Sequence, residues 1–193
     1  MSFEAAANSA ALLRGGALPV ELSILSKSTV GPSLGSDSLD KSTMAILIGA
    51  ALLIIFMIGY YRLPGTVAIF SLILYALLLL WGLAIFNATL TLAGIAGFAL
   101  SVGIAVDSNI IIYERIKEDL RSGKSLRAGI DSGFKRAFMT ILDANITTMI
   151  AALVLFKFGT GSVQGFALTL AIGLVASMFT AITFTHYMLK WTA

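Results

Sequence analysis

The sequence predicts an all-α membrane protein, a bundle of five transmembrane helices preceded by a small α+β remnant of an external domain. Its 193 residues are 58% hydrophobic and 12% charged, with a mean hydropathy of +0.95. A soluble domain averages about 45–50% apolar and about a quarter charged residues. Long apolar runs that tolerate glycine favour membrane helices over barrel strands. The sequence has no cysteine, which excludes disulfides and zinc thiolates within it.

Residues 1–41 differ in composition from the rest. The segment FEAAANSAALLR, followed by Gly15 and Gly16, predicts a short helix. Residues 18–30 alternate apolar and polar side chains as a strand does, and GPSLGSDSLDKS predicts a loop. Because one helix and one strand cannot bury a core, we expect residues 1–41 to be the C-terminal end of a larger external domain.

Residues 42–193 divide into five apolar spans and one polar segment. The spans cover about 44–61, 67–86, 92–113, 137–156 and 163–189. The polar segment, 114–136, separates the third span from the fourth. Since the first span begins only near Met44, we expect no signal peptide within this sequence.

The distribution of Lys and Arg predicts the orientation. The polar segment 114–136 holds seven of them, and Arg62 and Lys190 fall on the same side. The positive-inside rule therefore places the polar segment and the C-terminus in the cytoplasm and residues 1–41 outside. An external N-terminus needs an upstream helix or signal for delivery, so we expect at least one earlier helix to be missing from this chain.

Small residues recur every four positions in three spans. Such spacing lets helix backbones approach closely where lipid offers no hydrophobic driving force. It therefore predicts a tight bundle, although small residues are also simply common in membrane helices. The residues are Gly97, Ser101, Ala105 and Asn109 in the third span, Thr140, Ala144, Thr148 and Ala152 in the fourth, and Gly165, Thr169, Gly173, Ser177, Ala181 and Thr185 in the fifth.

Two aspartates inside the spans are the candidate functional residues. Asp107 lies seven residues before Glu114, and Asp143 lies seven residues after Arg136. On antiparallel helices both carboxylates then sit roughly 10 Å from the cytoplasmic edge. Each begins a D-x-N triplet. Because residues two apart on a helix point in different directions, Asn109 and Asn145 face other neighbouring helices than the aspartates do. We expect the two asparagines to donate interhelical hydrogen bonds and the carboxylates to face a cavity.

A charged, unpaired carboxylate in the membrane costs several kcal/mol, which favours a functional role for Asp107. Such a group can bind and release protons as its surroundings alternate between wet and dry. Three alternatives stay open: protonated aspartates that only join helices, an intramembrane aspartyl protease using Asp107 and Asp143, and a passive scaffold for partner proteins. The Gly-x-Gly-Asp run of such proteases is absent.

Other features carry less chemistry. His186, one turn from the end of the last span, favours an interfacial role over a proton relay. Leu126, Ile130 and Phe134 follow a possible N-cap at Ser125 with helical spacing, which predicts an amphipathic helix on the membrane surface. Its basic residues could contact anionic lipid or a cytosolic partner. The sequence contains no phosphate loop, metal cluster or nucleotide motif.

Several blocks of the sequence resemble the SecD/SecF family of protein-export membrane proteins, in the RND superfamily. They are AVDSNIIIYERIKEDLRSGKS and the stretch from FKRAFMTILDANITTMIA to LVASMFTA, and together with the upstream blocks the resemblance covers nearly all of the chain. GGALPVEL and TVGPSLGSDS are typical of the SecD members. Ser108 and Tyr113 stand where Ala and Phe are expected, which are mild changes.

The resemblance implies half of a proton-driven transporter, with six helices in the family. It implies a non-enzymatic subunit in the bacterial cytoplasmic membrane that pairs with SecF and works beside the SecYEG channel after SecA, and no nucleic acid or cofactor other than protons, with sodium left open. Asp107 would bind the proton, with Asp143 as a second coupling residue and Asn109, Asn145 and Thr147 as supporting polar residues. Another RND-type transporter half is the alternative. The first helix and most of the external domain would be missing.

Overall fold

The computed structural model describes Ala7, residues 10–11 and residues 32–192. Five helices are long and apolar enough to cross a membrane, which confirms the predicted five-helix architecture. They are α2 (Pro32–Tyr61), α3 (Leu63–Ile85), α4 (Leu92–Arg121), α5 (Leu126–Phe158), and a continuous fifth helix made of α6 (Ser162–Phe179), η1 (Thr180–Phe184) and α7 (Thr185–Thr192).

The expected α+β remnant at the N-terminus is not supported. Ala7, Ala10 and Ala11 are helical, but the strand expected over residues 18–30 lies outside the described residues. No strand occurs in the parts of the chain that the structure describes.

The loop predicted by GPSLGSDSLDKS is wrong, because α2 already begins at Pro32. Proline suits the first position of a helix, since its fixed φ angle matches and its missing N–H is not needed there. Downstream, Lys41 forms an ion pair of 2.7 Å with Asp37, and the Thr43 hydroxyl donates to the Leu39 carbonyl. Once α2 is nucleated, adding these turns costs little, so helix extension overrides the turn composition.

The polar segment 114–136 does not form a separate helix on the membrane surface. It consists of the end of α4, a turn at residues 122–125 and the start of α5. These helices have 30 and 33 residues, more than the roughly 20 that a bilayer requires, so their ends extend beyond it and pack on each other. Ile130 and Phe134 are accordingly buried against Ile116. Ser125 is at the N-cap as expected, but its side chain makes no capping bond.

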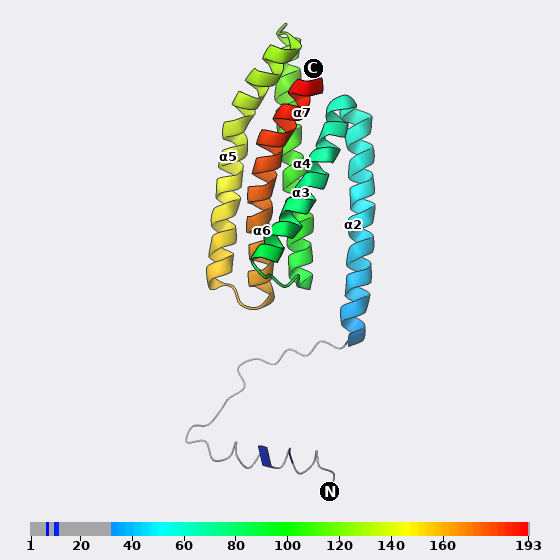
Figure 1. Cartoon of the computed structure of the whole chain (residues 1–193), viewed down its shortest axis with the longest axis vertical. Helices are drawn as coiled ribbons and strands as arrows, with labels where there is room; N and C mark the ends of the chain where they lie inside the picture. The colour runs from blue at the N-terminus through cyan, green and yellow to red at the C-terminus, as the bar shows by residue number, and fades with distance from the viewer. Residues whose placement is uncertain (1–6, 8–9, 12–31, 193) are drawn as a thin grey trace. The chain divides into compact units, whose positions relative to one another are not determined.

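The fifth helix lies at the centre of the bundle. Its α6 part contacts α3, α4 and α5, and α4 also contacts α3 and α5. By contrast, α2 lies at the margin, as Figure 1 shows. Its buried side chains, Met57 and Tyr61, are both near its C-terminal end and join a hydrophobic cluster with α3, α4, α5 and the end of the fifth helix.

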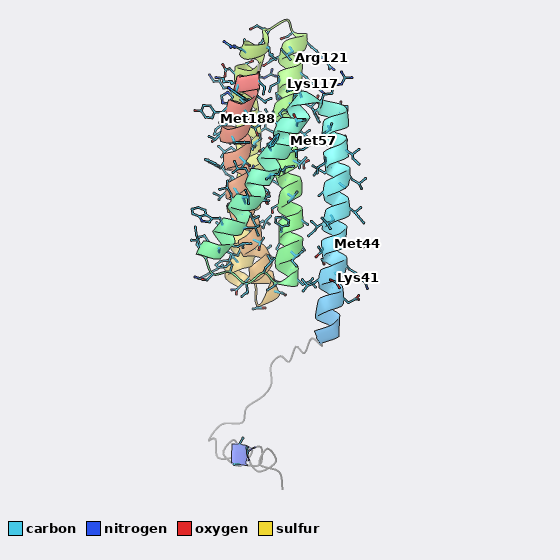
Figure 2. All side chains as sticks on the ribbon, turned by 45° about the vertical axis from the view of Figure 1, so that its right-hand side comes forward. Lys41, Met44, Met57, Lys117, Arg121 and Met188 are labelled. Carbon is cyan, nitrogen blue, oxygen red and sulfur yellow. The ribbon has the colours of Figure 1, made fainter. Side chains whose placement is uncertain are left out.

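The connections alternate between two ends of the bundle. The α2–α3 turn, the α4–α5 turn and the C-terminus share one end, called here the α4–α5 end (Figure 1). Figure 2 shows Lys117, Arg121 and Met188 at this end, and Lys41 and Met44 far from it on α2. The basic residues of the polar segment, Arg62 and Lys190 therefore gather at one end, which is the arrangement that the charge pattern predicts.

Candidate functional site

The two membrane aspartates are exposed on the surface of this chain. Asp107 is on α4 and Asp143 is on the neighbouring α5. Neither carboxylate forms a hydrogen bond or an ion pair with a described residue. The expected cavity among closely fitted helices is thus not formed around them by these five helices. The side of α4 that meets α6 carries small residues instead, and Asp107 points away from that contact.

Asn109 is buried and does connect helices. Its Nδ2 donates 3.1 Å to the Ala105 carbonyl one turn back on α4. Its Oδ1 lies 3.0 Å from the Thr185 hydroxyl of α7. The interhelical bond that the D-x-N pattern predicts is therefore present, but Asn109 accepts it where donation was expected.

Asn145 on α5 is also buried, yet its bonds stay within its own helix. Its Nδ2 donates 2.7 Å to the Ile141 carbonyl, and its Oδ1 has no hydrogen-bond partner among the described residues. Thr147 is exposed, and its hydroxyl donates to the backbone carbonyl of Asp143. The two D-x-N triplets therefore have similar positions but different surroundings.

A buried polar node joins α3, α4 and α7. The Thr185 hydroxyl lies 3.1 Å from Ser71 Oγ and 3.0 Å from Asn109 Oδ1. Thr185 follows the π-helical turn η1, whose wider winding lets its N–H bond the Thr180 carbonyl five residues back. Single π-turns inside α-helices are frequent at functional sites. Sequence reasoning missed Ser71, although Ser71 and Tyr75 are polar residues one turn apart within an otherwise apolar span.

The small residues of α4 and α6 meet along what is called here the α4–α6 seam, namely Gly97, Ser101, Gly165, Thr169 and Gly173. A Cβ added at Gly97 would lie 2.9 Å from the Phe166 carbonyl oxygen, and one at Gly173 would lie 2.7 Å from Ser101. Ser101 also accepts a 2.6 Å hydrogen bond from the Tyr75 hydroxyl. The backbones therefore approach so closely that side chains larger than these do not fit.

The remaining small residues divide into two groups. Ser177, further along α6, is fully buried and donates its hydroxyl to the Leu174 carbonyl. On α5, Thr140 and Ala144 are exposed, whereas Ala152 is buried. The four-residue pattern of the fourth span is therefore only partly used inside this chain.

Beyond the membrane span, Asp119 near the end of α4 fixes the α4–α5 turn. Its buried carboxylate lies 2.9 Å from both Lys124 and Arg136 and accepts a hydrogen bond from Ser132. The bonds from Ser132 and Lys124, with the charge of Arg136, lower the pKa of Asp119 from 3.8 to about 2. Since the folded pKa is the lower one, the stabilisation is complete above the ordinary pKa and is lost as the pH falls towards 2.

His186 lies in a second charged group at the same end. Its Nε2 is 3.1 Å from Asp131 Oδ1. The same Oδ1 forms an ion pair with Lys190, whose Nζ lies 2.6 Å away. The imidazole packs against Phe134 with the two rings tilted by 32° and their centroids 4.3 Å apart. In residues 32–192 and the three described alanines, no group of three or more His, Cys, Asp and Glu side chains could hold a metal ion.

The protein-family comparison identifies the chain. Residues 15–193 match the family model described as protein export membrane protein SecD/SecF, C-terminal. The chain belongs to the SecD/SecF family. It is 57% identical to the protein translocase subunit SecD of Syntrophobacter fumaroxidans over 92% of its length, and 56% identical to that of Acidaminococcus fermentans over 93%.

The SecD/SecF fold is also found by structural comparison. The crystal structure of SecDF, a translocon-associated membrane protein from Thermus thermophilus, covers all of this chain with a TM-score of 0.86 and 42% sequence identity. The chain spans 33% and 43% of the two SecD relatives named above and 27% of the SecDF chain. It therefore corresponds to part of those proteins.

Proposed function

We propose that this chain is the membrane part of a SecD-type subunit that uses the proton-motive force to promote late steps of polypeptide export. In this proposal Asp107 is the carboxylate that binds and releases the coupling proton, and sodium is the alternative ion. The subunit is not an enzyme, and its only small-molecule partner is the coupling ion. Membership of the SecD/SecF family supports the role in export, and the placement of Asp107 supports the choice of residue.

The observation that carries the proposal is the exposure of Asp107 on an apolar helix surface. A carboxylate that faced hydrocarbon would cost several kcal/mol unless it were neutralised or covered by protein. In Asp107 this cost is not offset by a partner within the described residues. We infer that the face bearing Asp107, and the outer face of α5 with Asp143, are covered in the assembled protein by a second bundle, namely SecF.

The covering bundle would complete the proton site. A group at such an interface alternates between wet and dry surroundings when the two halves rock against each other. One elementary charge that crosses 100 mV releases about 2.3 kcal/mol, enough to shift a conformational equilibrium by more than tenfold. Because this energy is supplied to the helices, it can be passed to segments outside the membrane that hold the exported polypeptide.

The proposal also includes the membrane in which the chain lies, its orientation and its partner proteins. The chain would lie in the bacterial cytoplasmic membrane with the α4–α5 end in the cytoplasm, as the concentration of Lys and Arg there favours. The start of α2 would then lie on the external side. The SecYEG channel and a preprotein pushed by SecA would be the further partners, and membrane lipid would cover the remaining surface.

The decisive experiment replaces Asp107 by Asn in the full-length protein. We expect the Asp107→Asn variant to assemble with SecF as the wild type does, and export to lose its dependence on the proton gradient. Export of a preprotein into inverted membrane vesicles, with and without a protonophore, measures this. Asp37→Asn, which removes an exposed carboxylate at the external end of α2, is the matched control. Export by Asp107→Asn that stays fully gradient-sensitive would reject the proton role.

The same variant tests the alternatives. A passive scaffold predicts that Asp107→Asn weakens partner binding and leaves gradient dependence unchanged. The small residues of α4 and α6 argue against a scaffold role, because they already pack these two helices against each other within the chain. An intramembrane protease predicts cleavage of a substrate that both Asp107→Asn and Asp143→Asn abolish. Another type of RND transporter predicts ion-coupled movement of a small solute in the absence of preprotein.

A further inference from the structure

A pocket opens between α5 and the end of the fifth helix, away from the candidate proton site. Its volume is about 240 Å³. It is lined by apolar and charged side chains that come from α4, α5, η1 and α7, namely Ile112, Asp131, Phe134, Lys135, Phe138, Ile141, Ile182 and His186.

The position of the pocket places it at the membrane interface. On α5 its lining runs from Asp131 to Ile141, in the half of the helix that is nearer to the α4–α5 turn. The neighbouring Tyr187 and Trp191 on α7 have exposed fractions of 71% and 84%. Exposed aromatic side chains near the end of a membrane helix are typical of the headgroup level. The pocket therefore extends from this level into the apolar part of the bilayer.

The charges around the pocket favour an anionic group. Asp131 is the one acidic side chain of the lining, and Lys190 and His186 already lie 2.6 Å and 3.1 Å from its Oδ1. Lys135 is exposed and has no ion-pair partner among the described residues. With Asp131 neutralised by Lys190, the rim keeps the positive charge of Lys135. Below the rim the lining is apolar, through Ile112, Phe138 and their neighbours.

The pocket is on a different face of the bundle from both membrane aspartates. At 100° per residue, Phe134 and Phe138 of the apolar lining lie about 180° and 140° around α5 from Asp143, whereas Lys135 at the rim lies about 80° from it. Ile112 lies about 140° around α4 from Asp107. A partner bundle that covers the two aspartates therefore need not cover the apolar part of the pocket, which can face the bilayer.

We infer that the pocket is a binding site for an anionic phospholipid, with the phosphate group at Lys135 and an acyl chain along Ile112, Phe138, Ile141 and Ile182. An anionic headgroup supplies the negative charge that would pair with Lys135. An acyl chain fills the apolar lining that opens to the membrane. The two halves of the pocket thus match the two halves of one amphiphile, which neither a free phosphate nor a soluble peptide does.

The test is lipid binding to the purified chain in detergent, measured by native mass spectrometry with phosphatidylglycerol and phosphatidylcholine of the same chain length. We expect phosphatidylglycerol to be preferred, and Lys135→Gln to weaken its binding about fivefold, the effect of one lysine at an anionic surface. Ile182→Trp, which fills the apolar part, should reduce binding of both lipids. Circular dichroism of each variant verifies that the helices are retained.

Arg121→Gln is the matched control, because Arg121 is an exposed cation at the same end that does not line the pocket. It should bind phosphatidylglycerol as the wild type does. Equal binding of the two lipids, an equal loss in Arg121→Gln and Lys135→Gln, or unchanged binding in Ile182→Trp would each overturn the inference. Such results would mean general attraction to a basic surface or occupation by another protein segment.

Discussion

The helices α4 and α2 have the same length but are attached to the bundle in opposite ways. Along the α4–α6 seam, glycine and small polar residues bring two backbones into contact over several turns. In α2, of 30 residues, the buried side chains are Met57 and Tyr61, and Gly49 and Gly59 have no neighbouring atom within 4 Å of an added Cβ. A helix held along its length moves with its partner, whereas a helix held at one end can change its angle.

The attachment of α2 is a small cluster called here the α2 clamp, made of Tyr60, Tyr61, Glu114 and Lys117. The Lys117 ammonium lies 4.3 Å from the Tyr60 ring centroid and 4.6 Å from that of Tyr61. Glu114 accepts 3.0 Å hydrogen bonds from Tyr61 and from Lys117. Gly65, at the start of α3, allows the backbone of α3 to reach the Met57 carbonyl. The clamp therefore connects α2 to the end of α4, two to three turns beyond Asp107.

The largest effect is expected from a bulky side chain that prevents the close approach of α4 and α6 along the α4–α6 seam. Gly97→Leu places a side chain against the Phe166 carbonyl oxygen, a backbone atom that cannot move aside. We expect a loss of about 3 kcal/mol in the free energy of unfolding, at the upper end of the usual cost of overpacking. Thermal unfolding of the purified chain in detergent, followed by circular dichroism, measures it.

Gly103→Leu is the control for this prediction. Gly103 lies on the same helix, but an added Cβ there has no atom within 4 Å. Its substitution should leave the unfolding temperature of the isolated chain unchanged. Equal destabilisation by both variants would show that helix propensity or detergent contact, and not close approach to α6, decides the stability.

A smaller loss is expected at the polar node. Thr185→Val keeps the side-chain shape but removes the hydroxyl that bonds Asn109, so a buried amide oxygen loses its partner. An unsatisfied buried acceptor costs about 1–3 kcal/mol, and we expect about 2 kcal/mol in the same unfolding measurement. Thr183→Val, at an exposed position two residues earlier, should be neutral. If the two variants lose the same stability, the node does not hold α7 to α4.

The sequence is sufficient to predict the parts of the fold that depend on composition and spacing. Apolar length identifies the five spans, because a bilayer demands about 20 apolar residues for each helix. The four-residue spacing of Gly97, Ser101, Gly165 and Gly173 marks the residues along which α4 and α6 lie together, but the same spacing on α5 falls partly on exposed positions, so spacing alone does not select the contact. The D-x-N triplets predict interhelical bonds for both Asn109 and Asn145, of which only Asn109 makes one within the described residues, as an acceptor.

Other features depend on contacts that no local pattern contains. The π-turn before Thr185 contains threonine and isoleucine, β-branched residues that also occur throughout the other spans, and nothing in this local pattern predicts that Thr185 meets Ser71 and Asn109. The direction of Asp107 depends on which face of α4 meets α6, and periodicity alone does not assign faces to neighbours. The helix from Pro32 to Lys41 forms despite its turn-rich composition, because it extends an adjoining stable helix.

The smallest effect on stability, and the sharpest test of how α2 is held, concerns the clamp. Lys117→Met keeps the apolar stem but removes the ammonium over the two tyrosine rings. Loss of a partly exposed cation–π contact costs about 0.5–1 kcal/mol, and loss of the Lys117–Glu114 ion pair within one helix costs about 0.3–0.5 kcal/mol more, so the unfolding temperature should change less than in Thr185→Val. The position of α2 should nevertheless become less defined. Because the chain has no cysteine, spin labels can be placed on cysteines introduced at the exposed Ile48 and Leu100.

Pulsed electron paramagnetic resonance should then show a broader Ile48–Leu100 distance distribution in Lys117→Met than in the parent chain. Arg121→Met removes another cation at the same end of α4 (Figure 2) and should leave the distribution unchanged, because Arg121 forms no ion pair within the described residues. A distribution that is equally narrow in Lys117→Met would show that α2 is held without the Lys117 ammonium, by Met57, Gly65 and the Tyr61–Glu114 hydrogen bond. The angle of α2 would then be fixed by backbone contact at the α2–α3 turn together with that hydrogen bond, and a movement of α4 would reach α2 through both.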